Sequence, residues 1–139
     1  MIPLSIIIVS FNTKEITKKC LLSLKNNFVK YPLEYEVIVI DNNSRDGTTE
    51  VILDMQKQWK NLHVFLNKKN LGFGKGSNFG LEKSKGKYIL YLNSDAIVSD
   101  IDFRDLIKIM EIQKDIGALT VKVVLPTGEI DPASHRGFP

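Results

Sequence analysis

Two polar side chains that could bind a metal ion follow an apolar run in the second half of the chain. The run Lys87–Leu92 (KYILYL) reads as a buried strand, and Asn93-Ser94-Asp95 comes directly after it. Mg²⁺ and Mn²⁺ prefer oxygen ligands and are often held by one or two carboxylates, with substrate phosphates completing the shell. Two acids at this spacing would be a stronger signal, because Asn93 is a neutral and weaker ligand. Asp95 is therefore a candidate metal ligand, and its alternative role is to begin a turn.

A second carboxylate follows an earlier apolar run. Asp41 comes after Tyr35–Ile40 (YEVIVI) and begins the turn-forming segment Asp41–Thr48 (DNNSRDGT). In one interpretation Asp41 bonds its own backbone within a turn. In the other it accepts a hydrogen bond from the imino N–H of a pyrimidine or from a ribose hydroxyl. Asp46 or Thr48 is instead expected to cap the helix that follows.

A glycine-rich segment, NKKNLGFGKGSNFG over residues 67–80, is predicted to connect a strand to a short helix. Its spacing is not G-x-G-x-x-G and it follows the third predicted strand, which excludes the dinucleotide fingerprint. A Walker loop is excluded because Lys75 is followed by Gly76, with no Ser or Thr in register. The glycines either allow close packing of the helix on a sheet or let a ligand approach the backbone at the helix N-terminus.

Other side chains of chemical interest are isolated in the sequence. Cys20 is the single cysteine and lies in an apolar helical pattern, so it is expected to pack as a small hydrophobic residue. His63 and His135 are expected at the surface or hydrogen-bonded rather than as metal ligands. Asp131 and His135 could transfer a proton, although their spacing alone gives no geometry for it.

Strands and helices alternate along the chain and would position these side chains. Strands are predicted over residues 4–10, 35–40, 62–66 and 87–92 and, from an alternating pattern, over 117–126. The first helix is predicted to begin at a capping box of Asn12 and Glu15. The alternation predicts an α/β fold, with a mostly parallel sheet and helices on both faces. Ligands bind such sheets at the carboxyl ends of the strands, where the residues discussed above would gather.

Length, charge and composition narrow the class of protein. A chain of 139 residues with 43% apolar and 25% charged residues fits one globular domain. The net charge of +3 is too small to indicate nucleic-acid binding, although it mildly favours an anionic ligand. The start lacks a basic region and a long apolar run, so we expect a cytoplasmic protein. Attachment to the inner face of the cell membrane through a partner stays open.

Three segments in order make this sequence resemble the nucleotide-sugar glycosyltransferases of family 2, which have the GT-A fold. The segments are IIIVSFN over residues 6–12, VIVIDNNSRDGT over 37–48 and NLGFGKGSNFGLEKSKGKYILYLNSDA over 70–96. The rhamnosyltransferase-like subset is similar in its Asn-Leu-Gly-Phe-Gly and Leu-Asn-x-Asp patterns. The resemblance runs from Leu4 to about Val124.

The resemblance implies a site for a nucleotide diphosphate sugar, the donor. Phe11 stands where the family often has an aromatic residue beside the base, and Asp41 matches the acid that bonds the base. Asp95 matches the acid that binds a divalent cation, Mn²⁺ or Mg²⁺, on the diphosphate. The cation would stabilise charge on the leaving nucleoside diphosphate. The implied donor-binding residues are Ser10, Phe11, Asn12, Asp41, Asn70, Asn78 and Asn93.

Two departures from the family pattern weaken the charge that would hold the donor. Ser77 stands where many members carry Arg, and Asn93 replaces the first acid of the Asp-x-Asp element. The resemblance further implies that residues 1–125 are the donor-binding domain and that 126–139 begin the acceptor-side region. The carboxylate base that inverting members use is then expected beyond residue 139, which leaves the activity of this chain alone open.

The implied reaction transfers a sugar from the donor to a saccharide or lipid-linked acceptor in polysaccharide or glycan biosynthesis. Peripheral membrane association and assembly with itself or with a partner chain stay open, and nucleic acid is not expected as a partner. A first alternative is a module that binds the donor without transfer. A second is a phospho-acceptor signalling domain built on Asp41, Asp95 and Lys122. The lack of an acid at the end of the first strand argues against it.

Overall fold

The computed structural model describes residues 1–132 and divides the chain into two compact units, Met1–Asp105 and Leu106–Pro139. All four strands and the first three helices lie in the first unit, and the fourth helix crosses the boundary. The elements are β1 (Ile2–Ser10), α1 (Lys14–Lys30), β2 (Tyr35–Asp41), α2 (Thr48–Lys57), β3 (Leu62–Leu66), α3 (Phe73–Lys83), β4 (Gly86–Tyr91) and α4 (Phe103–Ile112).

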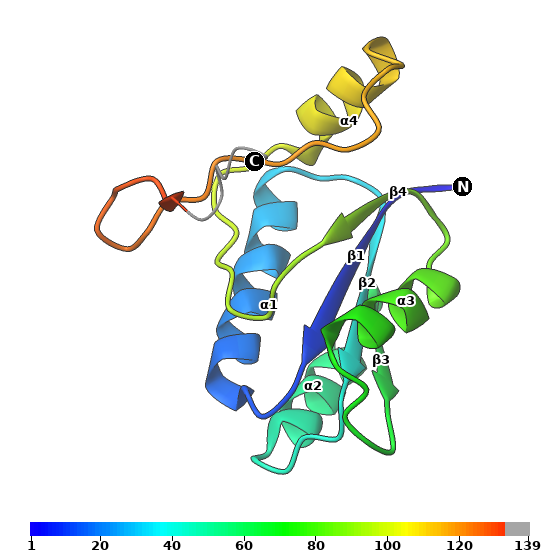
Figure 1. Cartoon of the computed structure of the whole chain (residues 1–139), viewed down its shortest axis with the longest axis vertical. Coiled ribbons are helices and arrows are strands. Elements are labelled where there is room, and N and C mark those ends of the chain that lie inside the picture. Colours follow the sequence, from blue (N-terminus) through cyan, green and yellow to red (C-terminus); the bar gives the residue numbers. More distant parts are fainter. Residues whose placement is uncertain (133–139) are drawn as a thin grey trace. The chain divides into compact units, whose positions relative to one another are not determined.

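The strands form one parallel sheet in the order β3-β2-β1-β4 (Figure 1). The chain adds β2 and β3 on one side of β1 and then crosses to place β4 on the other side. The carboxyl ends of β1 and β4 therefore flank a topological switch point, where open α/β sheets bind their ligands. The predicted α/β class and four of the five predicted strands are confirmed.

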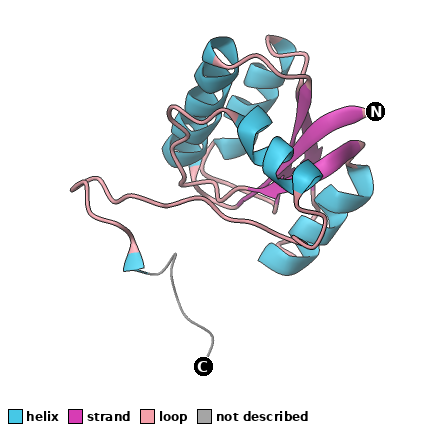
Figure 2. Cartoon of the chain, turned by 90° about the horizontal axis from the view of Figure 1, so that it is seen from above, coloured by secondary structure: helices cyan, strands magenta, loops and turns pink. Residues whose placement is uncertain are grey.

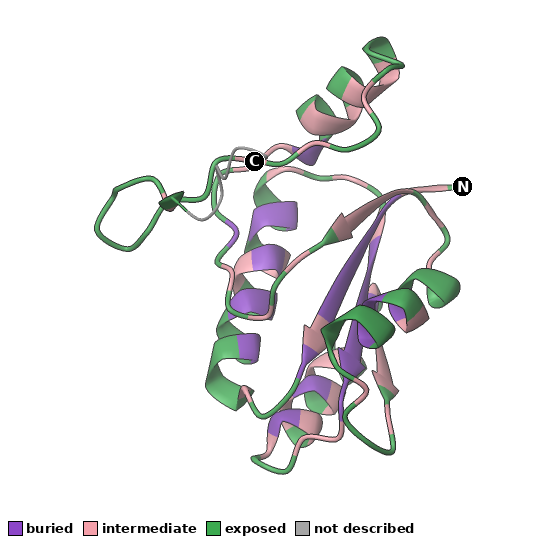
Figure 3. Cartoon of the chain, viewed as in Figure 1, coloured by how far each residue is buried: buried purple, intermediate pink, exposed green. Residues whose placement is uncertain are grey.

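Helices cover both faces of the sheet, as predicted. Figures 1 and 2 show α1 and α2 on one face and α3 on the other. The two central strands, β1 and β2, are buried over most of their length (Figure 3). Burial on both faces explains why their sequences are continuous apolar runs rather than alternating patterns.

Glycines let α3 lie close to the sheet. A Cβ on Gly80 would lie 2.5 Å from Cγ2 of Ile7, and one on Gly76 would lie 2.9 Å from Cγ1 of Val9. Real Cβ atoms do not approach other carbons this closely, so any larger residue would push the helix away from β1. For Gly76 and Gly80 the close-packing interpretation is correct.

The predicted capping box of α1 is wrong. The N-cap of α1 is Thr13, without a side-chain cap, and Asn12 lies in the left-handed region with a φ of 52°. The Asn12 side chain accepts a hydrogen bond from the backbone N–H of Arg45 at 2.8 Å. The Asn12 side chain, which the capping box required, is thus bonded to the loop after β2 instead of to the start of α1.

The fifth predicted strand, over residues 117–126, is also wrong. This segment contains a single antiparallel bridge, between Val124 and Ile130, around a turn closed by the Gly128 N–H and the Leu125 carbonyl at 2.9 Å. A strand needs a continuous row of backbone partners, and alternating side chains do not supply one. Nothing in the described part of this unit provides that row.

Candidate functional site

The carboxyl ends of β1, β2 and β3 are joined by backbone hydrogen bonds into one edge. Ser10 and Asp41, the last residues of β1 and β2, are neighbours in the sheet register. The Asn42 N–H donates to the Ser10 carbonyl at 2.9 Å, and the Asn67 N–H donates to the Asp41 carbonyl at 2.8 Å. The polar residues that follow three separate strands therefore meet at one edge, as the parallel sheet predicts.

Asp41 is buried at this edge, 1% exposed, and its carboxylate accepts four hydrogen bonds. Oδ1 accepts from the hydroxyls of Ser44 at 2.5 Å and Ser10 at 3.3 Å. Oδ2 accepts from the Thr49 hydroxyl at 2.9 Å and the Ser44 N–H at 3.0 Å. A carboxylate has about four acceptor positions, so the turn interpretation of Asp41 is correct and all positions are filled. Its predicted contact with a base stays a prediction.

Asn12 and Phe11 extend the loop after β1. The Asn12 N–H donates to the Ser44 hydroxyl at 2.9 Å, which, with the bond to Arg45, fastens this loop to the loop after β2. The Phe11 ring is 43% exposed and lies directly after the buried end of β1. An exposed aromatic ring held at the switch point provides a flat surface for stacking.

Asp46 joins the starts of two helices. Its carboxylate accepts the N–H of Lys14, the first residue of α1, at 3.0 Å and the N–H of Thr48, the first residue of α2, at 3.0 Å. The hydroxyl of Thr48 donates to the same carboxylate. The N-cap of α2 is Gly47 and Thr48 is the first helical residue, so neither predicted residue occupies the N-cap position. Asp46 still has a structural role from the position before the N-cap, and this role extends to a second helix.

Asn42 is a residue of this edge that the sequence did not single out. It is 2% exposed, its Nδ2 donates to the Gly72 carbonyl at 3.1 Å and its Oδ1 accepts from the Asn67 amide at 2.8 Å. It thereby connects β2 with the glycine-rich segment, 30 residues later in the chain. Its place directly after a buried strand was the one signal in the sequence.

The first glycines of the glycine-rich segment differ from Gly76 and Gly80. The Asn70 side chain accepts the Gly72 N–H at 2.8 Å and closes the turn before α3, and Gly72 has a φ of 81°. A Cβ on Gly74 would meet no atom within 4 Å. Packing therefore does not explain why position 74, in the first turn of α3, carries glycine.

Ser77 and Asn78 lie in the second turn of α3. The Ser77 hydroxyl is the one fully buried side-chain oxygen or nitrogen within residues 1–132 that has no hydrogen-bond partner. Asn78 is exposed, and at 100° per residue it points away from Gly76 and Gly80, which face the sheet. The structure does not bring Asn78 together with Ser10 and Asp41, and its role stays a prediction.

Asn93 and Asp95 follow β4 on the other side of the switch point and are exposed. No side-chain hydrogen bond or ion pair within the described chain occupies the Asp95 carboxylate. The buried Sγ of Cys20 lies behind this turn, 3.6 Å from the Asn93 carbonyl oxygen. Burial, aided by the nearby Asp95 charge, raises the pKa of Cys20 to about 12. Cys20 is therefore packed, as predicted, and its thiol stays protonated.

The donor atoms at Asn93 and Asp95 fit a hard divalent cation in part. Within residues 1–132 no three His, Cys, Asp or Glu side chains come close enough to hold a metal ion. Asp95 offers one unoccupied carboxylate and Asn93 one amide oxygen. Mg²⁺ and Mn²⁺ commonly accept so few protein ligands when substrate phosphates supply the others.

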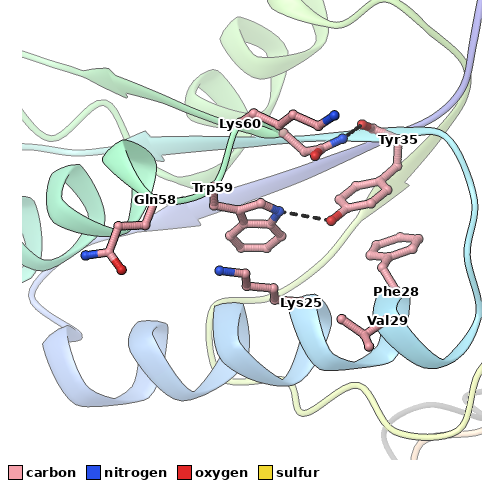
Figure 4. Close-up of a pocket in the computed structure, with 8 residues that line it drawn as sticks. Lys25, Phe28, Val29, Tyr35, Gln58, Trp59 and Lys60 are labelled. Carbon is pink, nitrogen blue, oxygen red and sulfur yellow. Dashed lines mark hydrogen bonds between the residues drawn. The ribbon is translucent and has the colours of Figure 1, made fainter.

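A hollow of about 280 Å³ lies near the amino-terminal ends of β2 and β3, at the end of the strands opposite the candidate site. Figure 4 shows its wall, where Lys25 reaches from α1 toward the indole of Trp59. The Trp59 N–H donates to the Tyr35 hydroxyl at 2.9 Å, and the rings of Phe28 and Tyr35 stack at 3.6 Å. Tyr35 begins β2 whereas Asp41 ends it, so this hollow is separate from the candidate site.

The remaining predicted residues lie elsewhere. His63 is exposed on β3, and Lys122 is exposed outside the four-stranded sheet, so the strand position that a phospho-acceptor domain requires of Lys122 is absent. Asp131 is described, whereas His135 lies outside the described residues.

Known proteins share this chain's sequence and fold. Residues 5–135 match the family Glycosyl transferase family 2. Glycosyltransferase AglE of Haloferax volcanii is 34% identical over 92 residues, which are 66% of this chain and 30% of AglE. The structure of S. aureus TarS 1-349 in complex with UDP-GlcNAc has a TM-score of 0.69 and 25% identity, over 81% of this chain and 32% of that chain.

A third protein shares the fold alone. The mannosyltransferase PcManGT from Pyrobaculum calidifontis, in complex with GDP-Man and Mn²⁺, has a TM-score of 0.62 and 18% identity, over 71% of this chain and 29% of that chain. The chain spans about a third of the length of each of these proteins. In residues 1–132 no helix has the length and apolar character to cross a membrane. On its sequence and its GT-A fold, the chain belongs to glycosyl transferase family 2.

Proposed function

We propose that this chain is the donor-binding part of a glycosyltransferase that moves a sugar from a nucleotide diphosphate sugar to a saccharide or lipid-linked acceptor in glycan biosynthesis. The observation that carries the proposal is the Asp95 carboxylate at the switch point, which no residue within 1–132 bonds and which lies opposite the loop of Phe11. Inversion at the anomeric carbon rests on the family resemblance, and the catalytic base is expected beyond residue 139.

In this proposal each part of the edge binds one part of the donor. Asp95, with Asn93, holds a Mn²⁺ or Mg²⁺ ion whose remaining ligands come from the diphosphate. This ion, when bound, neutralises charge that develops on the leaving diphosphate. The open position at Gly74 lets the ligand approach the first turn of α3, where free N–H groups favour anions. Phe11 supplies a stacking surface for the base.

Asp41 contacts the base only if one of its present hydrogen bonds is exchanged. The bond from the Ser10 hydroxyl is the longest of the four, at 3.3 Å, and is the one that a base N–H would replace. The Ser10 hydroxyl would then be free to bond a base carbonyl. A uridine or deoxythymidine donor presents this pair of groups. The UDP-GlcNAc bound to TarS supports a uridine nucleotide, and the family resemblance supports both.

Calorimetric titration of the purified chain with UDP, dTDP and GDP, each with and without Mn²⁺, tests the proposal. We expect metal-dependent binding of a pyrimidine diphosphate by the wild-type chain and its loss in Asp95→Ala. Asp54→Ala is the matched control, because Asp54 is an exposed acid on α2 that pairs with Lys57. A folded chain that binds none of the nucleotides would contradict the proposal.

A donor-binding module without transfer is the second candidate. The hydrogen bonding at the edge favours it, since Asp41 is saturated and, of these two acids, only Asp95 is left unbonded by the described residues. Incubation with UDP-sugars and saccharide acceptors decides between the two, because release of UDP that depends on acceptor is expected only from a transferase. Location in the cytoplasm, at the inner face of the membrane when the acceptor is lipid-linked, is the corresponding expectation for the cell.

A further inference from the structure

The segment that carries Asp95 has no helix or strand of its own. It runs from the end of β4 at Tyr91 to the start of α4 at Phe103. One tight turn, closed by the Ala96 N–H and the Asn93 carbonyl at 3.1 Å, contains Asp95. Because no residue within 1–132 bonds the Asp95 side chain, contacts of the neighbouring residues must determine where its carboxylate lies.

Those contacts come from one polar stripe on α1, formed by Cys20, Ser23, Asn27 and Lys30. The intervals of three, four and three residues place the four side chains on one face of the helix. The Ser23 hydroxyl accepts the Val98 N–H at 3.0 Å, and Lys30 pairs with Asp100. Cys20 contacts the Asn93 carbonyl, as described above. The stripe thus follows the segment from its beginning to its end.

Asn27 makes two hydrogen bonds to a single residue of the segment. Its Nδ2 donates to the Ile101 carbonyl at 2.8 Å and its Oδ1 accepts the Ile101 N–H at 3.0 Å, so a buried amide satisfies both backbone groups of one residue. Val98 and Phe103 are buried on either side, and the rings of Phe103 and Phe28 lie 5.4 Å apart. Polar and apolar contacts therefore fix the segment on the same helix.

We propose that the polar stripe of α1 positions Asp95 and thereby sets the affinity of the site for its divalent cation. Asp95 lies between two anchored points, Asn93 at Cys20 and Val98 at Ser23. Releasing either point, or the contact of Asn27 with Ile101 that holds the end of the segment, lets the turn move, so the carboxylate is no longer held ready for the metal. Residues that orient a metal ligand from behind typically change metal affinity about 10- to 100-fold when they are removed.

This inference rests on the proposed function, because it assumes that Asp95 binds the metal. The test measures Mn²⁺ affinity in the presence of saturating UDP for the wild-type chain, Ser23→Ala, Asn27→Ala and the control Asn26→Ala. Asn26 is the exposed neighbour of Asn27 and lies outside the polar stripe. We expect about tenfold weaker Mn²⁺ binding in Ser23→Ala and Asn27→Ala. Asn26→Ala should bind like the wild type, and Ser23→Thr, which keeps the hydroxyl, should restore affinity.

A second measurement separates this inference from the proposed function. Hydrogen exchange of peptides that cover residues 93–101 reports the anchoring directly and needs no nucleotide. We expect faster exchange there in Ser23→Ala and Asn27→Ala, with unchanged exchange in β1 and β2. Unchanged exchange in both variants, or wild-type Mn²⁺ affinity in both, would overturn the inference. A wild-type chain that binds no nucleotide contradicts the proposed function, and the exchange result then decides whether the stripe holds the turn.

Discussion

The two carboxylates at the carboxyl edge differ in the number of hydrogen bonds that they accept. Asp41 accepts four and is buried, whereas Asp95 accepts none from the described residues and is exposed. The sequence places Asp41 directly after one apolar run and Asp95 three residues after another, and nothing in either run distinguishes them. The difference arises from Ser10, Ser44 and Thr49, two of which follow Asp41 within eight residues.

Replacement of Asp41 by alanine should destabilise the protein by about 3 kcal/mol, because four donors near a buried site lose their acceptor. Urea unfolding followed through the fluorescence of Trp59, the single tryptophan, measures the change. Asp54→Ala, at an exposed position, should change the free energy of unfolding by less than about 0.5 kcal/mol. Equal stability of the two variants would show that the network around Asp41 contributes little.

Cys20 should be inert to thiol reagents in the folded protein. Its pKa is raised to about 12 by burial, so at pH 8 only about one thiol in ten thousand is the reactive thiolate. Ellman's reagent at pH 8 should therefore label the native chain very slowly and the chain in guanidinium chloride completely. Rapid labelling of the native chain would mean that α1 opens easily beneath Asn93.

At the scale of elements, sequence periodicity predicted α1 and the four strands, but not the contacts between loops. Continuous apolar runs indicated buried strands because β1 and β2 have helices on both faces. The pattern could not reveal that Asn42 bonds Gly72 or that Asn27 bonds Ile101, since these contacts join residues 30 and 74 positions apart. The capping box failed for the same reason, because Asn12 is used by a loop that arrives 33 residues later.

Two glycines of α3 should respond in opposite ways to alanine. Gly80→Ala places a methyl group 2.5 Å from Ile7 and should destabilise the protein by about 1–3 kcal/mol. Gly74→Ala meets no atom within 4 Å and should stabilise the helix by about 0.5–1 kcal/mol. Thermal unfolding of both variants measures this difference. Destabilisation by Gly74→Ala would indicate a packing role that the structure does not explain.

Asp46 should make the stability of the protein depend on pH, because its carboxylate bonds the first residues of both α1 and α2. The hydrogen bond from the Thr48 hydroxyl, together with the N–H groups of Lys14 and Thr48, holds the pKa of Asp46 below its usual 3.8. A lowered pKa in the folded state contributes stability above pH 3.8, and this stability is lost as the pH falls through the folded-state value.

Thermal melts of the wild type and Asp46→Ala between pH 2 and pH 7 test this dependence. The wild type should melt at the higher temperature at pH 7, and the difference should narrow below pH 3.8. A difference that is constant across this range would assign the effect to something other than the charge of Asp46.

At the scale of the whole molecule, the sheet order explains why the site lies where it does. The chain reverses its direction of growth at β1, so the carboxyl ends of β1 and β4 flank the topological switch point. Sequence alternation was sufficient to predict a parallel sheet and to place Asp95 after its fourth strand, and the family resemblance added the expected role in binding a cation. The prediction of a strand over 117–126 was wrong because a strand also requires a neighbouring strand to supply backbone hydrogen bonds, which its own side-chain pattern cannot show.

The close packing of α3 has a consequence for how such sequences evolve. Gly76 and Gly80 are required by the contact with β1 whether or not the protein transfers a sugar, whereas nothing in the fold requires Gly74. In a lineage that no longer binds a donor, selection should conserve Gly76 and Gly80 but not Gly74. Variation at position 74, together with conservation at positions 76 and 80, would therefore identify family members that have lost donor binding while keeping the fold.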